Sequence, residues 1–327
     1  MADSKTFSGF PVQNFSADQT SVGQIYYNSA SGTFKGVVTG GAPIGSWSSG
    51  GNLNTGRKDA AGFGEGHTAA IAAGGYSGGG ATGAQVESYN GTAWSETTEM
   101  TTQRGWTCSG AGTTTAGLIF GGQPLPPAGG QLTATEEWGG SSWTNGGNLN
   151  QGRSMVGGAG TQTAGLCYGG LTPSKTVNTE EYDGSSWTEV NNLPTASAAV
   201  ASSRGSAQTN AFSAGSTPVT TSVYLYDGTN WTAGPSLNTA RGNAGGAGTS
   251  SLGIVAGGPG AIAKTEGFDG TSWTELSDLA TGRTAMGTGG TSSTNALLFG
   301  GENPPGYLTA TEEWAAADIQ VKTLTTS

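Results

Sequence analysis

The chain has 327 residues and a formal net charge of −10, and only 10% of its residues are charged. Such a chain lacks the basic patch that neutralises phosphates or acidic lipid headgroups, so we expect neither a nucleic-acid partner nor membrane insertion. Its 61 glycines suggest low complexity, but nine Trp, nine Tyr and nine Phe, most of them regularly spaced, indicate order. Together these features predict an all-β, turn-rich protein.

The N-terminal sequence MADSKTFSGF has no basic region followed by an apolar run, so no signal peptide is expected. No apolar stretch approaches the ~20 residues of a membrane span. We therefore expect synthesis in a cytoplasm, with any export occurring by another route.

Residues 1–45 do not share the pattern of the rest of the chain. They contain GQIYYNSASGTFKG, from Gly23 to Gly36, in which two runs of aromatic and β-branched residues flank a Ser-Gly turn. This pattern predicts a β-hairpin. It resembles the short "GQ-YYN…G-F" hairpins of marine, cyanophage-like bacteriophage tail-fibre and other virion proteins. The resemblance implies an arm that attaches the chain to a particle, and the alternative is an arm packed against the remainder of the protein.

From residue 46 the chain repeats itself six times. Each repeat has a Trp, then a phrase such as NGGNLNQGR, then a small-residue strand and an apolar strand, and finally an acidic-aromatic turn such as EEYDGSSW. The Trp residues recur at intervals of 47, 49, 44, 44 and 42: Trp47, Trp94, Trp143, Trp187, Trp231 and Trp273. A Gly-Gly pair follows sixteen or seventeen residues after the Arg of the phrase, and the fourth repeat has Ala214-Gly215 instead.

This succession resembles the kelch motif, which implies four antiparallel strands per blade around a central channel. The first copy has a Trp strand without inner strands, and the last has inner strands without a Trp strand. We therefore expect a six-bladed kelch-type β-propeller in which Trp47 to Asn54 is the outer strand of the sixth blade, which removes open sheet edges. The expected domains are an N-terminal arm (1–45), the propeller (46–317) and a C-terminal tail (318–327).

One Arg and one Glu occupy fixed repeat positions, and the fourth repeat lacks both, carrying Ser197 and Tyr224. Their joint loss predicts that the two side chains meet as a buried pair that fixes each blade, because removing one partner alone costs roughly 3–5 kcal/mol. A ring of ligand-binding charges is the alternative. The predicted structural residues are Arg57, Arg104, Arg153, Arg241, Arg283, Glu87, Glu136, Glu180, Glu266 and Glu312.

No catalytic constellation stands out. His67, the one histidine, falls in a predicted surface turn, and Cys108 and Cys167 are expected to be small core residues inside strands. The Asp-Gly turns lack the alternating carboxylates of a calcium loop, and a metal site would need several His or Cys ligands. The Glu-Glu pairs belong to the repeat, although a glycosidase-like pair remains an alternative. We expect no enzyme activity, no cofactor and no metal.

Loops between the second and third strands vary most, and some are rich in proline and aromatic residues, which favour binding. Trp106 stands two residues after Arg104, where the repeat requires no aromatic. The alternative is ordinary surface variation. The candidate binding residues on this loop face are Trp106, Tyr76, Tyr307, Pro124, Pro126 and Pro304.

These expectations, with the virion resemblance, favour a non-enzymatic phage structural protein that displays a propeller on the particle exterior as a tail or fibre adhesin or a capsid decoration. Its expected partners are other virion proteins, reached through the arm, a host-surface glycan or protein, and further copies of itself. A secreted or surface bacterial carbohydrate-binding or adhesion propeller is the alternative. An enzyme that uses the channel mouth is a third class.

Overall fold

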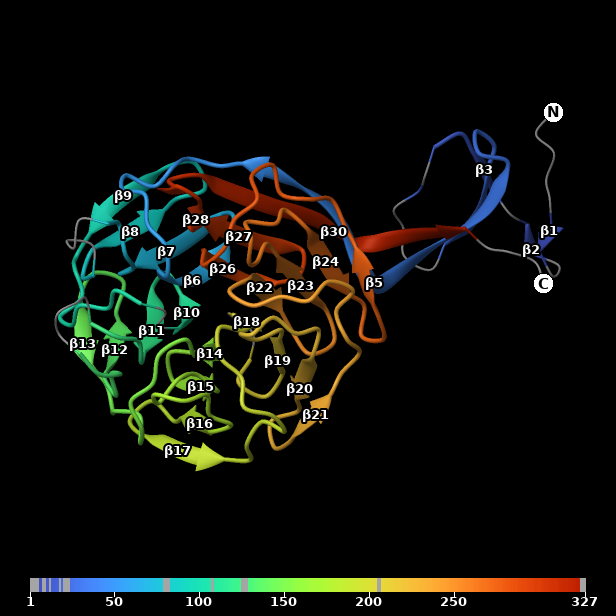
Figure 1. Ribbon diagram of the computed structural model, residues 1–327. Coiled ribbons are helices and arrows are strands. Elements are labelled where there is room, and N and C mark those ends of the chain that lie inside the picture. The colour runs from blue at the N-terminus through green and yellow to red at the C-terminus, as the bar shows by residue number, and fades with distance from the viewer. Residues whose placement is uncertain are drawn as a thin grey trace.

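The computed structural model describes residues 6–7, 10–11, 13–17, 19, 24–78, 83–106, 109–124, 129–204 and 207–323. Every regular element in these ranges is a β-strand. Figure 1 shows the sheets arranged radially around a common centre, the architecture of a β-propeller. No helix in the described part of the chain is long and apolar enough to cross a membrane.

Five sheets have four strands in chain order, and each is antiparallel throughout. The first sheet consists of β6 (Ala61–Gly66), β7 (Ala69–Ala73), β8 (Val86–Tyr89) and β9 (Trp94–Thr97), and the second of β10 (Ser109–Thr113), β11 (Ala116–Phe120), β12 (Thr135–Trp138) and β13 (Trp143–Asn145). The third consists of β14 (Gly157–Thr161), β15 (Ala164–Tyr168), β16 (Thr179–Tyr182) and β17 (Trp187–Val190), and the fourth of β18 (Ala201–Ser202), β19 (Ala211–Ala214), β20 (Val223–Tyr226) and β21 (Trp231–Ala233). The fifth consists of β22 (Gly245–Gly248), β23 (Gly253–Ala256), β24 (Thr265–Phe268) and β25 (Trp273–Glu275).

A sixth sheet has six strands, in the order β26 (Gly287–Ser292), β27 (Asn295–Phe299), β30 (Thr311–Thr323), β5 (Thr33–Ser49), β4 (Ile25–Asn28) and β3 (Gln13–Phe15). It combines strands from both ends of the chain. The remaining strands form two short pairs, β1 (Thr6–Phe7) with β2 (Phe10–Pro11) and β28 (Glu302–Asn303) with β29 (Gly306–Tyr307).

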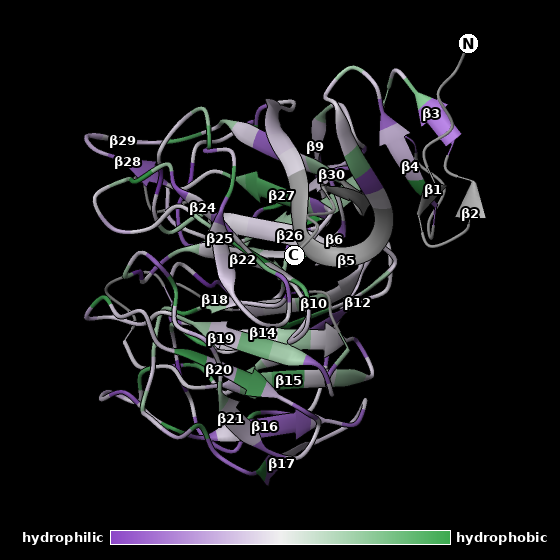
Figure 2. Ribbon diagram, turned by 90° about the vertical axis from the view of Figure 1, so that its right-hand side faces the viewer, coloured by the Kyte–Doolittle hydropathy of each residue, from purple (hydrophilic) through white to green (hydrophobic). Residues whose placement is uncertain are grey.

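The first strands of the sheets lie side by side around the centre, and β26 contacts β6. These strands consist mainly of Gly, Ala, Ser and Thr because the backbones approach too closely for larger side chains. A Cβ on Gly62 would lie 2.1 Å from the carbonyl oxygen of Thr288, and one on Gly246 would lie 2.7 Å from that of Ser202. The second strands are buried on both faces, as their continuous apolar sequences predict. Figure 2 shows this hydrophobic character along β15 and β19.

Each outer strand begins with a Trp whose ring packs against the preceding sheet. Trp187 contacts Phe120 with ring centroids 4.9 Å apart, and Trp231 contacts Tyr168 at 4.8 Å. Their indole N–H groups donate to threonines of that same neighbouring sheet, Trp187 to Thr135 and Trp231 to Thr179. Aromatic packing and a hydrogen bond thus join consecutive sheets.

Strands β5 and β30 pair from Glu312 and Ser49, beside the inner strands of the sixth sheet, to Thr323 and Lys35 at the opposite end of the pairing. A register shift between Ala317 and Ile319 interrupts the pairing. Strand β5 therefore runs through the expected 45/46 domain boundary, and β30 runs through the 317/318 boundary. The expected arm and tail are parts of one sheet with the last inner strands, and we call the paired segments 33–45 and 317–323 the ribbon (Figure 1).

At the far end of the ribbon, β4 and the start of β5 form a hairpin within residues 23–36, where Asn28 pairs with Thr33. Tyr26 is fully buried there and packs edge-on against Phe15. Figure 2 shows β3 and β4 on one side of the molecule and the β28–β29 loop on the opposite side.

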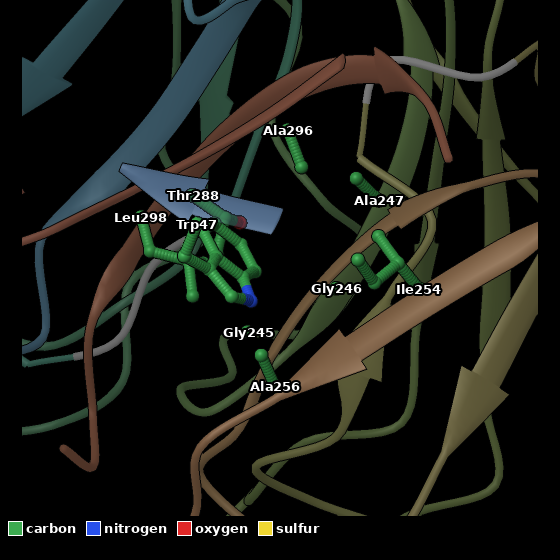
Figure 3. Close-up of a pocket in the computed structure, with 9 residues that line it drawn as sticks. All are labelled: Trp47, Gly245, Gly246, Ala247, Ile254, Ala256, Thr288, Ala296 and Leu298. Atoms are coloured by element: carbon green, nitrogen blue, oxygen red, sulfur yellow. The ribbon is translucent and has the colours of Figure 1, made fainter. Parts of the chain in front are cut away.

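A gap of about 10 Å³ lies beside Trp47, between β23 and β27 (Figure 3). Ala256 lines this gap at the β23 position where β11, β15 and β27 carry Phe120, Tyr168 and Phe299, so no aromatic ring from that position fills the space. A gap of this size has room for about one water molecule. It is a packing defect and not a ligand site.

Candidate binding site at the mouth of the channel

A chain of backbone hydrogen bonds circles the channel mouth two residues after the repeated Arg position. Four of its five members donate their N–H to the carbonyl of the equivalent residue in the preceding sheet: Asp59 to Ala285, Ala285 to Asn243, Asn243 to Ala199, and Ala199 to Met155, at 2.7 to 2.9 Å. All five residues have left-handed backbones, with φ between 48° and 59°. This conformation is costly for residues other than glycine, so the bonds between sheets must hold it in place.

Trp106 does not belong to this chain of bonds, although it also stands two residues after its Arg. It forms a β-bridge with Gln123, in the way that Lys58 bridges Tyr76 and Ser154 bridges Leu171. Trp106 is therefore the structural equivalent of residues that stand one place after the Arg, and Gly105 is an insertion. Counting two residues from the Arg therefore places Trp106 one residue out of register with the other repeats.

Trp106 lies on the edge of a cavity of about 280 Å³ that is lined by Lys58, Asp59, Tyr76, Trp106 and Met155. These residues come from three consecutive repeats. The Trp106 side chain is 39% exposed, and Tyr76 is half-buried. The structure thus brings together two of the candidate aromatic residues at one hollow on the loop face.

Tyr307, a third candidate, contacts two residues of the cavity lining, Tyr76 and Lys58. Its ring meets Tyr76 edge-to-face with centroids 5.6 Å apart, and the Lys58 ammonium lies 5.5 Å from the Tyr307 ring centroid. The same ammonium donates to Glu302 at 2.8 Å. Burial lowers the pKa of Lys58, but the hydrogen bond to Glu302 and the charges of Asp59 and Glu302 outweigh burial and raise it. Lys58 is therefore a fixed cation.

The two candidate prolines in the described part of the chain, Pro124 and Pro304, do not line the cavity. Pro304 is exposed in the turn between β28 and β29, where the Pro304–Pro305 peptide bond is cis. Pro124 is half-buried and directly follows Gln123. Pro126 lies outside the described residues.

The predicted Arg and Glu residues meet in all five repeats that carry them, and their side chains are 0 to 3% exposed. Arg241 lies 2.7 Å from Glu266, and its guanidinium also donates to the carbonyls of Gly257 and Lys264. The second oxygen of Glu266 accepts the N–H of Asn238, which precedes the Arg. Each pair thus joins the third strand to the Gly-Gly turn and to the segment just before the Arg, which leads in from the preceding sheet. None of the five Arg residues lines the cavity.

Burial and pairing act in opposite directions on the pKa values of these buried Arg and Glu side chains. It lowers the pKa of Arg57 and Arg283 despite the attraction of Glu87 and Glu312. Burial would raise the pKa of Glu136, but hydrogen bonds from Thr101 and the charge of Arg104 lower it overall. The carboxylates and the terminal guanidinium nitrogens are hydrogen-bonded, as buried charges require, although the Nε atoms of Arg104 and Arg153 have no partner among the described residues.

A second set of acidic residues joins neighbouring sheets and was not anticipated from the sequence. The Tyr182 hydroxyl donates to Glu137 at 2.6 Å, Tyr226 donates to Glu181 at 2.8 Å, and Tyr89 donates to Glu313. Burial, together with the hydrogen bond to the carboxylate, raises the pKa of Tyr89 and of Tyr182 to about 12. The sequence does contain a signal for these contacts. A Tyr ends the third strand of a repeat only where the preceding repeat has a Glu-Glu pair, and for Tyr89, in the first repeat, that pair belongs to the last repeat.

His67 lies in the turn between β6 and β7, as predicted from the sequence, and this turn is bonded to the sixth sheet. Its N–H donates to the Asn295 side chain at 2.8 Å, and its Nδ1 lies 3.2 Å from the carbonyl oxygen of Trp314. The imidazole therefore joins the β6–β7 turn to the sixth sheet. Cys167 is buried in β15, where desolvation raises the pKa of its thiol to about 12, and Cys108 lies outside the described residues. Among the described residues, no three His, Cys, Asp or Glu side chains are grouped to hold a metal ion.

In the fourth repeat, the residues that replace the Gly-Gly pair differ from the predicted ones. Gly215, with φ of 71°, takes the place of the first glycine of the Gly-Gly pair, and Ser216 takes the place of the second. The N–H of Ser216 donates to the carbonyl of Arg241, just as the N–H of Gly75 donates to that of Arg104. The sequence had placed this pair one residue too early, at Ala214-Gly215.

No family model matches the sequence, and no curated protein matches it. Solved structures do resemble the fold. One of them, titled "Structure of YjhT", aligns with a TM-score of 0.67 and 13% sequence identity, over 83% of this chain and 99% of that one. At this identity the likeness extends to the fold alone, and it supports a β-propeller.

Proposed function

We propose that the six sheets are the blades of a kelch-type propeller, closed by β5 as the outer strand of the sixth blade. The behaviour of Trp47 supports this proposal. Its indole N–H donates to Thr265 of the preceding sheet at 2.9 Å, as Trp94 donates to Thr311 and Trp187 to Thr135. A strand from the N-terminus thus makes the contacts that an outer strand makes in the other sheets.

We propose that this propeller is a non-enzymatic structural protein of a phage virion, displayed on the particle exterior. The observation that carries the proposal is the ribbon, in which both chain ends leave the propeller as one pair of strands. The far end of the ribbon and the β28–β29 loop lie on opposite sides (Figure 2). An attachment through the ribbon would therefore leave the loop face pointing outward, toward a host surface or a neighbouring subunit.

The proposed lack of enzyme activity is supported by the contacts that the buried Arg and Glu side chains make. The five buried Arg–Glu pairs are engaged within their sheets, and Glu137, Glu181 and Glu313 are engaged between sheets. General acid–base catalysis needs a titratable group that can reach a substrate. These carboxylates instead accept hydrogen bonds from groups that hold the fold together.

Mass spectrometry of purified phage particles tests the assignment, and the presence of this chain at structural copy number is the expected result. A variant lacking residues 1–40 should remain folded, because residues 44–49 still pair with β30, but it should be lost from particles. Trp106→Ala is the matched control and should be incorporated normally. Absence of the intact chain from particles would refute the virion role, and normal incorporation of the truncated chain would refute attachment through the arm.

The alternative is a secreted or surface bacterial adhesion propeller that binds carbohydrate without a particle. The exposed indole of Trp106 at a hollow on the loop face is the observation that favours it. Recovery of the chain from bacterial surfaces, with none in particles, would support this alternative.

A further inference from the structure

We propose that the cavity beside Trp106 binds one neutral pyranose ring of a glycan. This proposal deepens the proposed role of the loop face and rests on it.

Trp106 differs from every other Trp in the described part of the chain. The indole N–H groups of the other eight donate to protein oxygens, as those of Trp138 and Trp314 donate to the carbonyls of Thr114 and Ser293. The full set of donors comprises Trp47, Trp94, Trp138, Trp143, Trp187, Trp231, Trp273 and Trp314. The Trp106 indole makes no such bond to a described residue, and it is 39% exposed. An aromatic ring with an unused donor beside a hollow is suited to a ligand that has both an apolar face and hydroxyl groups.

The groups around the cavity fit a sugar. The C–H face of a pyranose can stack on the indole, and its hydroxyls can donate to the Asp59 carboxylate and accept from the Lys58 ammonium. The charges favour a neutral ring. Lys58 is already compensated by Glu302 at 2.8 Å, and Asp59 adds a further negative charge to the lining. An anionic sugar would therefore meet no free positive charge.

The site is also held rigidly before a ligand arrives. Asp59 and Met155 are fixed by their bonds to Ala285 and Ala199 in the backbone chain at the channel mouth. Tyr76 is held edge-on by Tyr307. A preorganised hollow loses little entropy on binding. Its volume of about 280 Å³ suits one compact ring, whereas an extended peptide would need a longer groove.

Saturation-transfer NMR on the intact protein provides the test, with the methyl glycosides of glucose, galactose, mannose and glucuronic acid as probes. We expect at least one neutral glycoside to bind, and Trp106→Ala to weaken its binding about tenfold or more, as truncation of a central aromatic contact does. Val219→Ser is the control, because Val219 is 48% exposed in another loop between second and third strands and does not line the cavity. This control should bind the glycoside as the parent protein does.

Several outcomes would overturn the proposal. These are no binding of any neutral glycoside, equal binding by Trp106→Ala with an unchanged melting temperature, a preference for the glucuronide, and binding of peptides but not of sugars. Incorporation into particles is measured separately, so failure of the sugar site leaves the test of the virion role intact.

Discussion

Trp47 and Trp314 face each other across strands β5 and β30, with ring centroids 5.3 Å apart and an interplanar angle of 53°. One of these residues lies near the start of the chain and the other near its end. Their contact holds β5 beside β30 within the sixth sheet, and the bond from Trp47 to Thr265 joins β5 to the fifth sheet. The first prediction concerns this junction.

Deleting residues 1–56 should remove the partner of β30 and expose its edge to other chains. We expect a lower melting temperature and concentration-dependent aggregation, measured by differential scanning fluorimetry and light scattering. Deletion of residues 1–40 is the control, because it retains the strand around Trp47. A monomeric 57–327 fragment with an unchanged melting temperature would contradict closure by β5.

The buried pairs predict strong non-additivity. Arg153→Ser leaves the Glu180 carboxylate buried without its cation and should cost roughly 3–5 kcal/mol of unfolding free energy. Adding Glu180→Tyr reproduces the combination found naturally at Ser197 and Tyr224, and should restore part of the loss. Urea titration followed by Trp fluorescence measures both variants. A double variant less stable than Arg153→Ser alone would show that the fourth repeat tolerates the change for other reasons.

The Tyr–Glu contacts between sheets predict a specific alkaline sensitivity. The folded-state pKa of Tyr182 is about 12, above its ordinary value of about 10, so its contribution is fully present below pH 10 and is lost as pH rises toward 12. Tyr182→Phe should lower stability by roughly 1.5–3 kcal/mol near neutral pH, because it removes a hydrogen bond to a charged group. Its difference from the parent should shrink between pH 10 and 12.

Thermal melts from pH 8 to pH 12 would measure this difference. The double variant Tyr182→Phe with Glu137→Leu is the control, since it copies the natural junction of Leu225 and Phe268 and leaves no unpaired carboxylate. A difference between Tyr182→Phe and the parent that stays constant through pH 12 would count against the Tyr–Glu contact.

The inner strands predict that glycine is required for space. Gly62→Ala would place a Cβ 2.1 Å from the Thr288 carbonyl, where only a backbone shift of the adjoining strand can relieve the clash. We expect a large loss of stability, or failure to fold, judged by soluble yield and melting temperature. Gly306→Ala meets nothing within 4 Å and should change stability by no more than about 0.5 kcal/mol. Similar melting temperatures for the two variants would contradict this account of the channel.

Repetition made the all-β fold and the Arg and Glu positions predictable, because each feature recurs with the same neighbours. The register of Trp106 was not predictable from spacing. Arg57 and Arg104 each stand 17 residues before their Gly-Gly pair, but the extra residue is a bulge between Gly64 and Gly66 in the first repeat and Gly105 in the second. The Arg-to-Gly-Gly spacing is therefore the same in these two repeats, although the extra residue lies at a different place in each.

The cavity was also beyond sequence reasoning, although Tyr76, Tyr307 and Trp106 were all candidates. Their grouping depends on how adjacent repeats are rotated about the channel. Nothing in the sequence around Lys58 and Asp59 indicates that these two residues line a cavity. The continuity of β5 and β30 through the expected boundaries was missed for a related reason. A pairing between residue 35 and residue 323 leaves no trace in local composition.

The sixth sheet also imposes an order on synthesis. Strand β5 leaves the ribosome before all five four-stranded sheets, whereas its partner β30 is made after them. At usual translation rates the delay is on the order of tens of seconds, during which the intervening sheets can form in turn. Throughout that time the part of β5 beyond its hairpin with β4 has no partner, and another newly made copy could pair with it. The synthesis of β30 is therefore the step that ends the risk of joining two chains by mistake.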